Sequence, residues 1–261
     1  MNLSSITAVI MDMDGVLWEG DHALPGLVPL FDFLRERKLK FALATNNATR
    51  NPAEYIAKFE RLGVQGVRAD QIVTSGMVTA RYLQSSYPAG TAVHVLGSDG
   101  LRNILTAAGF LLTDEKVEAV VAGLDMHLTY EKLKRASLLI QNGAAFIATN
   151  EDPSLPSPEG LIPGAGSVIA ALQTACGKTP FVMGKPHKPM YDIALEILDA
   201  PPNETLMIGD RLDTDIAGAI ALGIPTTLVL TGASSREDVE NGSIKPDSIF
   251  AGLPELLAAW E

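Results

Sequence analysis

The stretch Ala8-Val9-Ile10-Met11-Asp12-Met13-Asp14-Gly15 places an apolar run directly before two aspartates that are two positions apart. A short apolar run of this kind is typical of a strand that is buried on both faces of a sheet. If the chain is still extended there, the two carboxylates point to the same side, and Gly15 then allows a sharp turn. The stretch therefore predicts a buried strand that ends in two converging carboxylates.

Similar apolar runs recur along the chain, with helix-period stretches between them. One such helix is predicted over residues 130–141, with Thr129 as its N-cap and Gly143 just past its end. The alternation of strands and helices predicts an α/β fold with parallel sheets covered by helices. The other predicted strands are Phe41–Ala44, Val93–Leu96, Ala119–Val121, Ala144–Ala148, Phe181–Met183, Leu206–Ile208 and Thr226–Leu230.

Polar residues at the strand ends separate these strands into two sets. Acidic residues and residues suited to phosphate binding follow the runs near the two chain ends, whereas the middle of the chain has a βαβαβ pattern of its own. We therefore expect a discontinuous, Rossmann-like core with a parallel sheet, formed by residues 1–79 and 178–261. The expected insert is a second α/β domain, residues 80–177.

Composition restricts the class of protein. The 261 residues are 47% hydrophobic, and 20 Lys and Arg against 31 Asp and Glu give a net charge of −11, which fits a folded globular enzyme and argues against a nucleic-acid surface. The single cysteine, Cys176, indicates a reducing, cytoplasmic setting. The sequence shows no secretory signal pattern and no apolar run of about 18 residues, so membrane insertion is not expected.

Asp12 and Asp14 suggest phosphoryl chemistry. Two adjacent carboxylates repel each other unless a cation binds, and hard oxygen ligands favour Mg²⁺. Asp12 is suited to attack phosphorus as a nucleophile, and Asp14 to protonate the leaving oxygen and later to deprotonate water. An acidic turn or a structural cation site is the alternative.

Other strand ends carry complementary groups. Thr45, Asn46 and Asn47 offer neutral donors for phosphoryl oxygens, although the same residues are also ordinary cap and turn formers. Lys185, between Gly184 and Pro186, can offset the charge shared by Asp12 and a phosphoryl group.

Gly209-Asp210-Arg211-Leu212-Asp213-Thr214-Asp215 follows another apolar run. Asp210 is a candidate cation ligand, and Asp215 is a candidate to orient a metal-bound water or Lys185. The alternative is ordinary negative charge at a helix N-terminus, which stabilises a helix by about 0.3–1 kcal/mol for each charge. Three carboxylates in six residues are more than helix capping needs.

Taken in order, these segments resemble the four motifs of the haloacid dehalogenase (HAD)-like phosphatases, and the match spans the whole predicted core. The size and position of the insert resemble the C2-type cap of the NagD-like, para-nitrophenylphosphatase branch. The segments that carry the resemblance are Asp12-Met13-Asp14-Gly15-Val16-Leu17-Trp18, Thr45-Asn46-Asn47, Ala148-Thr149-Asn150 with Asp152, Gly160-Leu161-Ile162-Pro163-Gly164, Gly184-Lys185-Pro186 and Gly209-Asp210 through Asp215.

The resemblance implies a role for each matching residue. Asp12 would be the nucleophile and a Mg²⁺ ligand, and Asp14 the acid/base that binds the metal through its backbone carbonyl. Asp210 would complete the protein's metal ligands, Lys185 would neutralise the phosphoryl group, and Asp215 would support the site.

The resemblance also implies the substrate-binding residues. Thr45 and Asn46, with the neighbouring Asn47, would hold the phosphoryl group. Asn150 and Asp152 would belong to a cap loop that closes over the substrate.

The function expected from this resemblance is Mg²⁺-dependent hydrolysis of phosphate monoesters of small metabolites through a phospho-aspartate. A phosphotransferase or mutase, and a phospho-receiver regulator that stores the phosphoryl group, are the alternatives. Caps of this size in the family often pair, so a homodimer is a further expectation. Trp18 is interpreted as a packing residue, with an apolar flap against the leaving group as the alternative.

Overall fold

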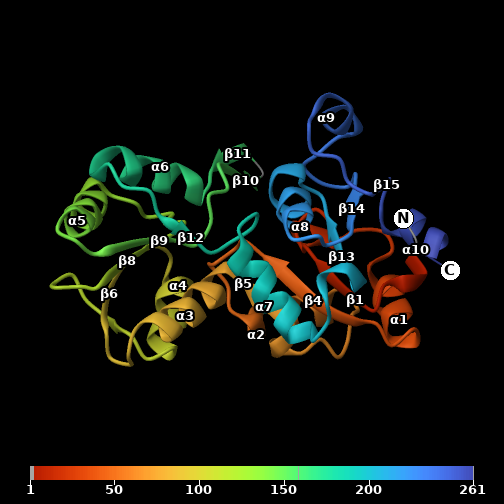
Figure 1. The fold of residues 1–261 in the computed structure, drawn as a ribbon, viewed down its shortest axis with the longest axis horizontal. Coiled ribbons are helices and arrows are strands. Elements are labelled where there is room, and N and C mark those ends of the chain that lie inside the picture. Colours follow the sequence, from red (N-terminus) through yellow and green to blue (C-terminus); the bar gives the residue numbers. More distant parts are fainter. Residues whose placement is uncertain (1–2, 158, 261) are drawn as a thin grey trace. The chain divides into compact units, whose positions relative to one another are not determined.

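The computed structural model describes residues 3–157 and 159–260, and its backbone contacts divide the chain into two units (Figure 1). The first unit comprises Met1–Thr45, Pro52–Val73 and Lys185–Glu261. The second comprises Asn46–Asn51 and Thr74–Gly184. Both are built from parallel strands with intervening helices, so the predicted α/β class is confirmed.

The first unit is built on a six-stranded sheet. β1 lies between β13 and β4 and pairs in parallel with both, and β14 pairs in parallel with β13 and β15. The strands, in spatial order, are β15 (Ser248–Phe250), β14 (Thr226–Val229), β13 (Thr205–Gly209), β1 (Ala8–Met11), β4 (Lys40–Thr45) and β5 (Ile72–Thr74).

Helices cover this sheet because the central strand is apolar on both faces. All four residues of β1 are fully buried, as the apolar run predicts. Val9 and Met11 share a core cluster with residues of α1, α2 and α10, and α7 packs against β4. The helices are α1 (Leu27–Glu36), α2 (Pro52–Arg61), α7 (Lys188–Leu198), α8 (Ala217–Ala221), α9 (Arg236–Asn241) and α10 (Leu253–Trp260).

Shorter elements complete the first unit. A small antiparallel hairpin follows the Asp-rich end of β1, and a π-helical turn, η4, precedes α8. The remaining short helices are of the 3₁₀ type. The bounds are β2 (Trp18–Glu19), β3 (His22–Ala23), η1 (Leu3–Ser5), η2 (Ala69–Gln71), η3 (Pro202–Glu204) and η4 (Leu212–Ile216).

The second unit has a parallel five-stranded sheet and a separate antiparallel hairpin. The sheet order is β12 (Phe181–Val182), β9 (Ala145–Ala148), β8 (Ala119–Ala122), β6 (Ala92–Leu96) and β7 (Leu111–Leu112). The hairpin pairs β10 (Ser154–Ser157) with β11 (Gly160–Pro163). The helices are α3 (Ser75–Ser86), α4 (Asp99–Ala107), α5 (Tyr130–Gln141) and α6 (Ala165–Cys176).

Several local predictions hold in detail. Helix α5 has the predicted bounds, and the Thr129 hydroxyl accepts a hydrogen bond from the Lys132 amide at 3.3 Å, as an N-cap does. Each predicted apolar run overlaps a strand, but the short strands β2, β3, β5, β7, β10, β11 and β15 were not predicted. No helix in the described part of the chain is long and apolar enough to cross a membrane.

The boundaries between the two units, as their backbone contacts define them, differ from the domain boundaries expected at 79/80 and 177/178. Helix α3 and the segment 178–184 lie with the second unit, where β12 pairs with β9. Residues 46–51 also group with that unit. The apolar run at 181–183 resembles a core strand in sequence, and only its pairing partner shows which sheet it joins.

His94 on β6 makes the stability of the second unit sensitive to acid. Burial lowers the pKa of His94, while a hydrogen bond between its Nδ1 and Asp114, at 2.9 Å, opposes this effect. A folded-state pKa below the unfolded value means that the unfolded chain binds more protons, so this stability is present above about pH 6.5 and is lost as the pH falls below it.

We therefore expect His94→Asn, which keeps a donor near Asp114, to weaken the loss of unfolding free energy between pH 7 and pH 5. Urea titrations followed by circular dichroism measure this, and His22→Asn at an exposed imidazole is the matched control. An unchanged pH dependence in His94→Asn would contradict the assignment.

Candidate active site

Two carboxylates follow adjacent strands of the first unit. Asp12 comes directly after β1, and its amide continues the pairing with β13 by donating to the Ile208 carbonyl at 2.9 Å. Asp210 comes directly after β13. Because the carboxyl ends of parallel strands meet at one edge of a sheet, residues 198 positions apart, 210 − 12, become neighbours.

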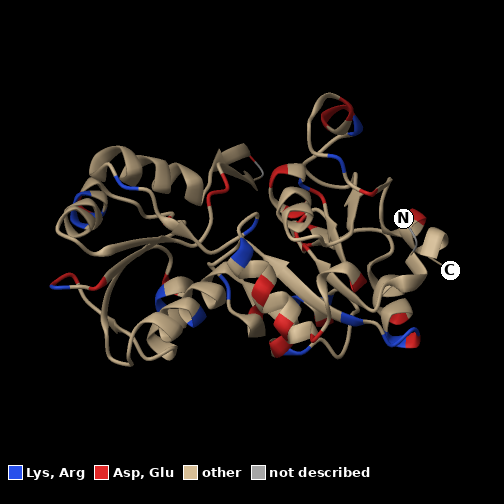
Figure 2. Cartoon of the chain, viewed as in Figure 1, with Lys and Arg blue, Asp and Glu red and all other residues tan. Residues whose placement is uncertain are grey.

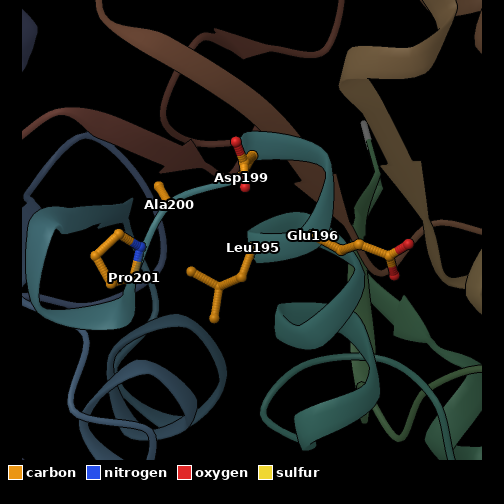
Figure 3. Close-up of a pocket in the computed structure, with 5 residues that line it drawn as sticks. All are labelled: Leu195, Glu196, Asp199, Ala200 and Pro201. Atoms are coloured by element: carbon orange, nitrogen blue, oxygen red, sulfur yellow. The ribbon is translucent and has the colours of Figure 1, made fainter.

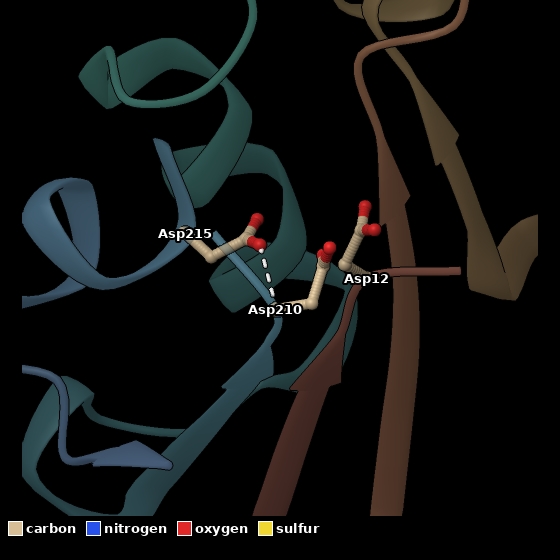
Figure 4. A group of neighbouring side chains, drawn as sticks. All are labelled: Asp12, Asp210 and Asp215. Carbon is tan, nitrogen blue, oxygen red and sulfur yellow. Dashed lines mark hydrogen bonds between the residues drawn. The ribbon is translucent and has the colours of Figure 1, made fainter. Parts of the chain in front are cut away.

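A third carboxylate, Asp215, reaches the same place from the π-helical turn η4 (Figure 4). Its Oδ2 accepts hydrogen bonds from the backbone amides of Asp210 and Arg211 at 3.2 and 3.1 Å. The buried Tyr191 hydroxyl donates to the carbonyls of Thr214 and Asp215, both at 2.9 Å, and so holds the turn. Hydrogen bonds therefore hold Asp215 by both its side chain and its backbone carbonyl.

Lys185 supplies the positive charge. Its Nζ lies 2.5 Å from Asp12 Oδ1 and 2.6 Å from Asp215 Oδ1, and it donates to the Ala44 carbonyl at 3.0 Å. The ammonium group is almost fully buried, so these ion pairs are shielded from water. Lys185 therefore places a buried positive charge beside Asp12.

Burial and the mutual proximity of these groups shift their proton affinities. Burial raises the pKa of Asp12 well above its usual range, and the Lys185 charge opposes this rise. Burial and the Asp215 charge raise the pKa of Asp210 to about 7. Burial lowers the pKa of Lys185, but attraction to Asp12 and Asp215 outweighs this and raises it, which keeps the amine protonated.

The donor set fits a hard divalent cation. Oxygens of Asp12, Asp210 and Asp215 all lie within 4.8 Å of one another. Asp210 Oδ2 accepts from the Ala233 amide at 2.7 Å, whereas Asp210 Oδ1 is buried and has no hydrogen-bond partner among residues 3–157 and 159–260. A buried carboxylate oxygen without a donor is costly unless a cation takes its place.

Asp14 lies outside this carboxylate cluster. Its side chain is exposed, and its Oδ1 accepts a hydrogen bond from Trp18 Nε1 at 2.8 Å. Asp14 therefore has a different environment from Asp12, although both follow the same strand. One carboxylate is buried against a lysine, and the other is open to solvent.

The predicted substrate-binding residues divide between the two units. Thr45 ends β4 in the first unit and is buried. In the second unit, Asn46 Nδ2 donates to Asp152 Oδ1 at 2.9 Å, and Asn150 Nδ2 donates to the Asn46 carbonyl at 2.8 Å. Asn47 Oδ1 instead accepts from the amide and hydroxyl of Thr49, which is the turn-forming alternative.

Several residues that build the site were not predicted. Tyr191 holds η4, the Thr231 hydroxyl donates to the Gly15 carbonyl at 2.6 Å, and the Ala233 amide binds Asp210. All three contacts involve a main-chain carbonyl or amide, and every residue type except proline has both groups. Sequence patterns therefore had little signal by which to find them.

A surface pocket elsewhere in the first unit is lined by other residues (Figure 3). Leu195, Glu196, Asp199, Ala200 and Pro201 line it, and none of them belongs to the carboxylate cluster. These residues surround the C-terminal end of α7. That end leads back toward the start of β13, at the sheet edge opposite the carboxyl ends of the strands.

Comparison with known proteins identifies related chains. The model of the haloacid dehalogenase-like hydrolases matches residues 9–111, and a HAD-hydrolase-like model matches residues 182–256. An acid sugar phosphatase of Staphylococcus saprophyticus is 36% identical over 260 residues, covering 99% of this chain and 100% of that protein.

Solved structures agree. The crystal structure of a 4-nitrophenylphosphatase from Thermotoga maritima superimposes with a TM-score of 0.94 at 36% identity, covering 99% of each chain. A glycerol phosphate phosphatase from Mycobacterium tuberculosis, crystallised in complex with magnesium, gives a TM-score of 0.88 at 34% identity. That match covers 97% of this chain and 77% of the other.

Close packing around Asp210 yields a test of the metal site. A Cβ added at Gly232 would lie 2.0 Å from Asp210 Oδ2 and 2.6 Å from its Cβ, so Gly232→Ala must displace the carboxylate or its loop. Disturbing groups that orient a metal ligand typically costs about 10–100-fold in metal affinity. We expect a loss of this size in Mg²⁺ affinity, measured by calorimetry.

The control is Gly97→Ala, whose added Cβ meets only side-chain atoms of Leu101 and Val95. It should bind Mg²⁺ as the unchanged protein does. Equal affinity in both variants would show that Asp210 does not take part in metal binding.

Proposed function

Because the chain belongs to the haloacid dehalogenase-like hydrolase family, in its NagD-like, para-nitrophenylphosphatase branch, and is a phosphatase, we propose that it hydrolyses small phosphate monoesters through a phosphorylated Asp12. Sugar phosphates are the proposed substrate class, as the name of the Staphylococcus relative suggests. The observation that carries the proposal is the cluster of Asp12, Asp210 and Asp215, two of which, Asp12 and Asp215, form ion pairs with Lys185. No basic surface is needed for such a substrate, and Figure 2 shows Lys and Arg interspersed with Asp and Glu.

Mg²⁺ is the proposed cofactor. The side chains of Asp12 and Asp210 would hold it, with the backbone carbonyl of Asp14, and the partnerless Asp210 Oδ1 supports this ligand set. When bound, Mg²⁺ would supply positive charge that offsets the carboxylates and the incoming phosphoryl group.

In the first step, an Asp12 carboxylate oxygen attacks phosphorus and the bond from phosphorus to the ester oxygen breaks. Asp14 donates a proton to that leaving oxygen, so the product departs as an alcohol. Lys185 holds Asp12 in place through their ion pair and remains protonated while negative charge gathers on the phosphoryl group.

In the second step, Asp14, now a carboxylate, removes a proton from water, and the oxygen attacks the phosphorus on Asp12. Inorganic phosphate leaves and the Asp12 carboxylate is restored. Asp215 keeps Lys185 oriented through both steps, because the ion pair between them does not depend on the charge of Asp12.

We further propose that Thr45 and Asn46 donate hydrogen bonds to the phosphoryl oxygens. Asn150 and Asp152 would contact the remainder of the substrate. The hydrogen bonds that join Asn46 to Asp152, and Asn150 to the Asn46 backbone, support a shared role for these three residues, because they hold them close together.

Asp12→Asn tests the nucleophile. The amide is a poor nucleophile, so we expect kcat on sugar phosphates and on p-nitrophenyl phosphate to fall by about 10³-fold or more. Acid-quenched protein should also lose the phosphorylated aspartate that mass spectrometry detects in the unchanged enzyme. Asp192→Asn, at an exposed carboxylate on α7 paired with Lys188, is the control. Turnover that persists in Asp12→Asn would refute the mechanism.

The raised pKa of Asp210, about 7, predicts that Mg²⁺ binding depends on pH. A raised folded-state pKa means that the metal-free protein holds protons on the cluster from about pH 4 to pH 7, and these protons compete with a cation. We therefore expect apparent Mg²⁺ affinity to rise between pH 6 and pH 8, with protons released on binding. Calorimetry in buffers of different ionisation enthalpy measures both, and affinity independent of pH would contradict the assignment.

A further inference from the structure

Trp18 is fully buried in the first unit, yet its polar atom is directed to Asp14. The indole Nε1 donates to Asp14 Oδ1 at 2.8 Å. The backbone closes the same small turn, because the Gly15 amide donates to the Trp18 carbonyl at 2.8 Å. The only other tryptophan, Trp260, donates to a backbone carbonyl, that of Leu3, at 3.2 Å.

Helix α2 fixes the indole ring. Phe59 packs edge-on against it with ring centroids 4.9 Å apart, and Tyr55 stacks at 6.4 Å. The Lys58 ammonium lies 3.9 Å from the ring centroid and donates to the Gly20 carbonyl at 2.8 Å, which ties the β2–β3 hairpin to the helix. The indole N–H therefore has one available direction.

Asp14 needs such a partner. Its exposed carboxylate would otherwise rotate freely, whereas a general acid must point its proton at the leaving oxygen. A hydrogen bond to one carboxylate oxygen fixes the plane of the group and leaves the other oxygen for proton transfer.

We propose that Trp18 is a positioning residue for proton transfer: its indole N–H, held by α2, orients the Asp14 carboxylate toward the leaving oxygen of the substrate. This inference rests on the proposed function, in which Asp14 is the acid. Apolar packing explains the burial of the Trp18 ring, but it does not explain why the indole N–H points at Asp14.

The test uses leaving groups. p-Nitrophenolate departs without a proton, whereas the alkoxide of a sugar phosphate or glycerol phosphate needs one, so misplacing the acid penalises alkyl esters selectively. For Trp18→Phe we expect kcat/KM to fall about tenfold or more on glycerol phosphate and less than about twofold on p-nitrophenyl phosphate. Trp260→Phe, which also loses an indole hydrogen bond, should leave both values unchanged.

Asp14→Asn separates this inference from the proposed function. It should show the same selectivity with a larger loss on glycerol phosphate, and adding Trp18→Phe should lower kcat/KM no further. An equal loss on both esters in Trp18→Phe, or no loss on either, would overturn the positioning role while Asp14→Asn still supported the acid. An Asp14→Asn variant without selectivity would overturn the acid assignment itself.

A spectroscopic measurement does not depend on the folding of Trp18→Phe. The Trp260→Phe protein has a single indole, so ¹⁵N labelling gives one Nε1–H resonance. Adding Asp14→Ala should move that proton resonance upfield, because the carboxylate acceptor is gone. An unchanged resonance would show that the indole does not donate to Asp14 in solution.

Discussion

The ion pairs of Lys185 with Asp12 and Asp215 are the interactions on which the rest of the site depends. Three buried carboxylates lie together and the Lys185 ammonium pairs with two of them, so negative charge is in excess when all three are ionised. Water would screen such an excess, but these side chains are almost fully buried. The protein can keep the arrangement by holding protons, as the raised pKa values of Asp12 and Asp210 indicate, or by binding a cation.

The same constraint explains why the surroundings are built from backbone amides and glycine. Amides of Asp210, Arg211 and Ala233 donate to the carboxylates, and such donors stabilise negative charge without adding a titratable group. They reach the carboxylates only where the chain approaches closely. The space taken at Gly232 shows how little room is left for any side chain beside Asp210.

The two aspartates of the first stretch show how one strand end provides two different environments for a carboxylate. Asp12 is buried against the Lys185 ammonium, whose charge opposes the rise in the Asp12 pKa that burial causes. Asp14, two residues later, is exposed and bound to an indole N–H, which suits a group that must gain and lose a proton. The turn at Gly15, with a φ of 85°, directs the chain away from the strand directly after both aspartates.

Sequence alone determined the alternation of strands and helices, the cap of α5, and the placing of Asp12, Asp210 and Lys185 after apolar runs. These features follow from periodicity and turn chemistry, which are local. Only the tertiary structure decided that β12 pairs with β9, that Asp215 stands in the carboxylate cluster, and that the Trp18 indole holds Asp14. Those outcomes depend on which distant atoms meet, and Lys185 and Asp12, 173 residues apart, become partners only once the sheet has formed.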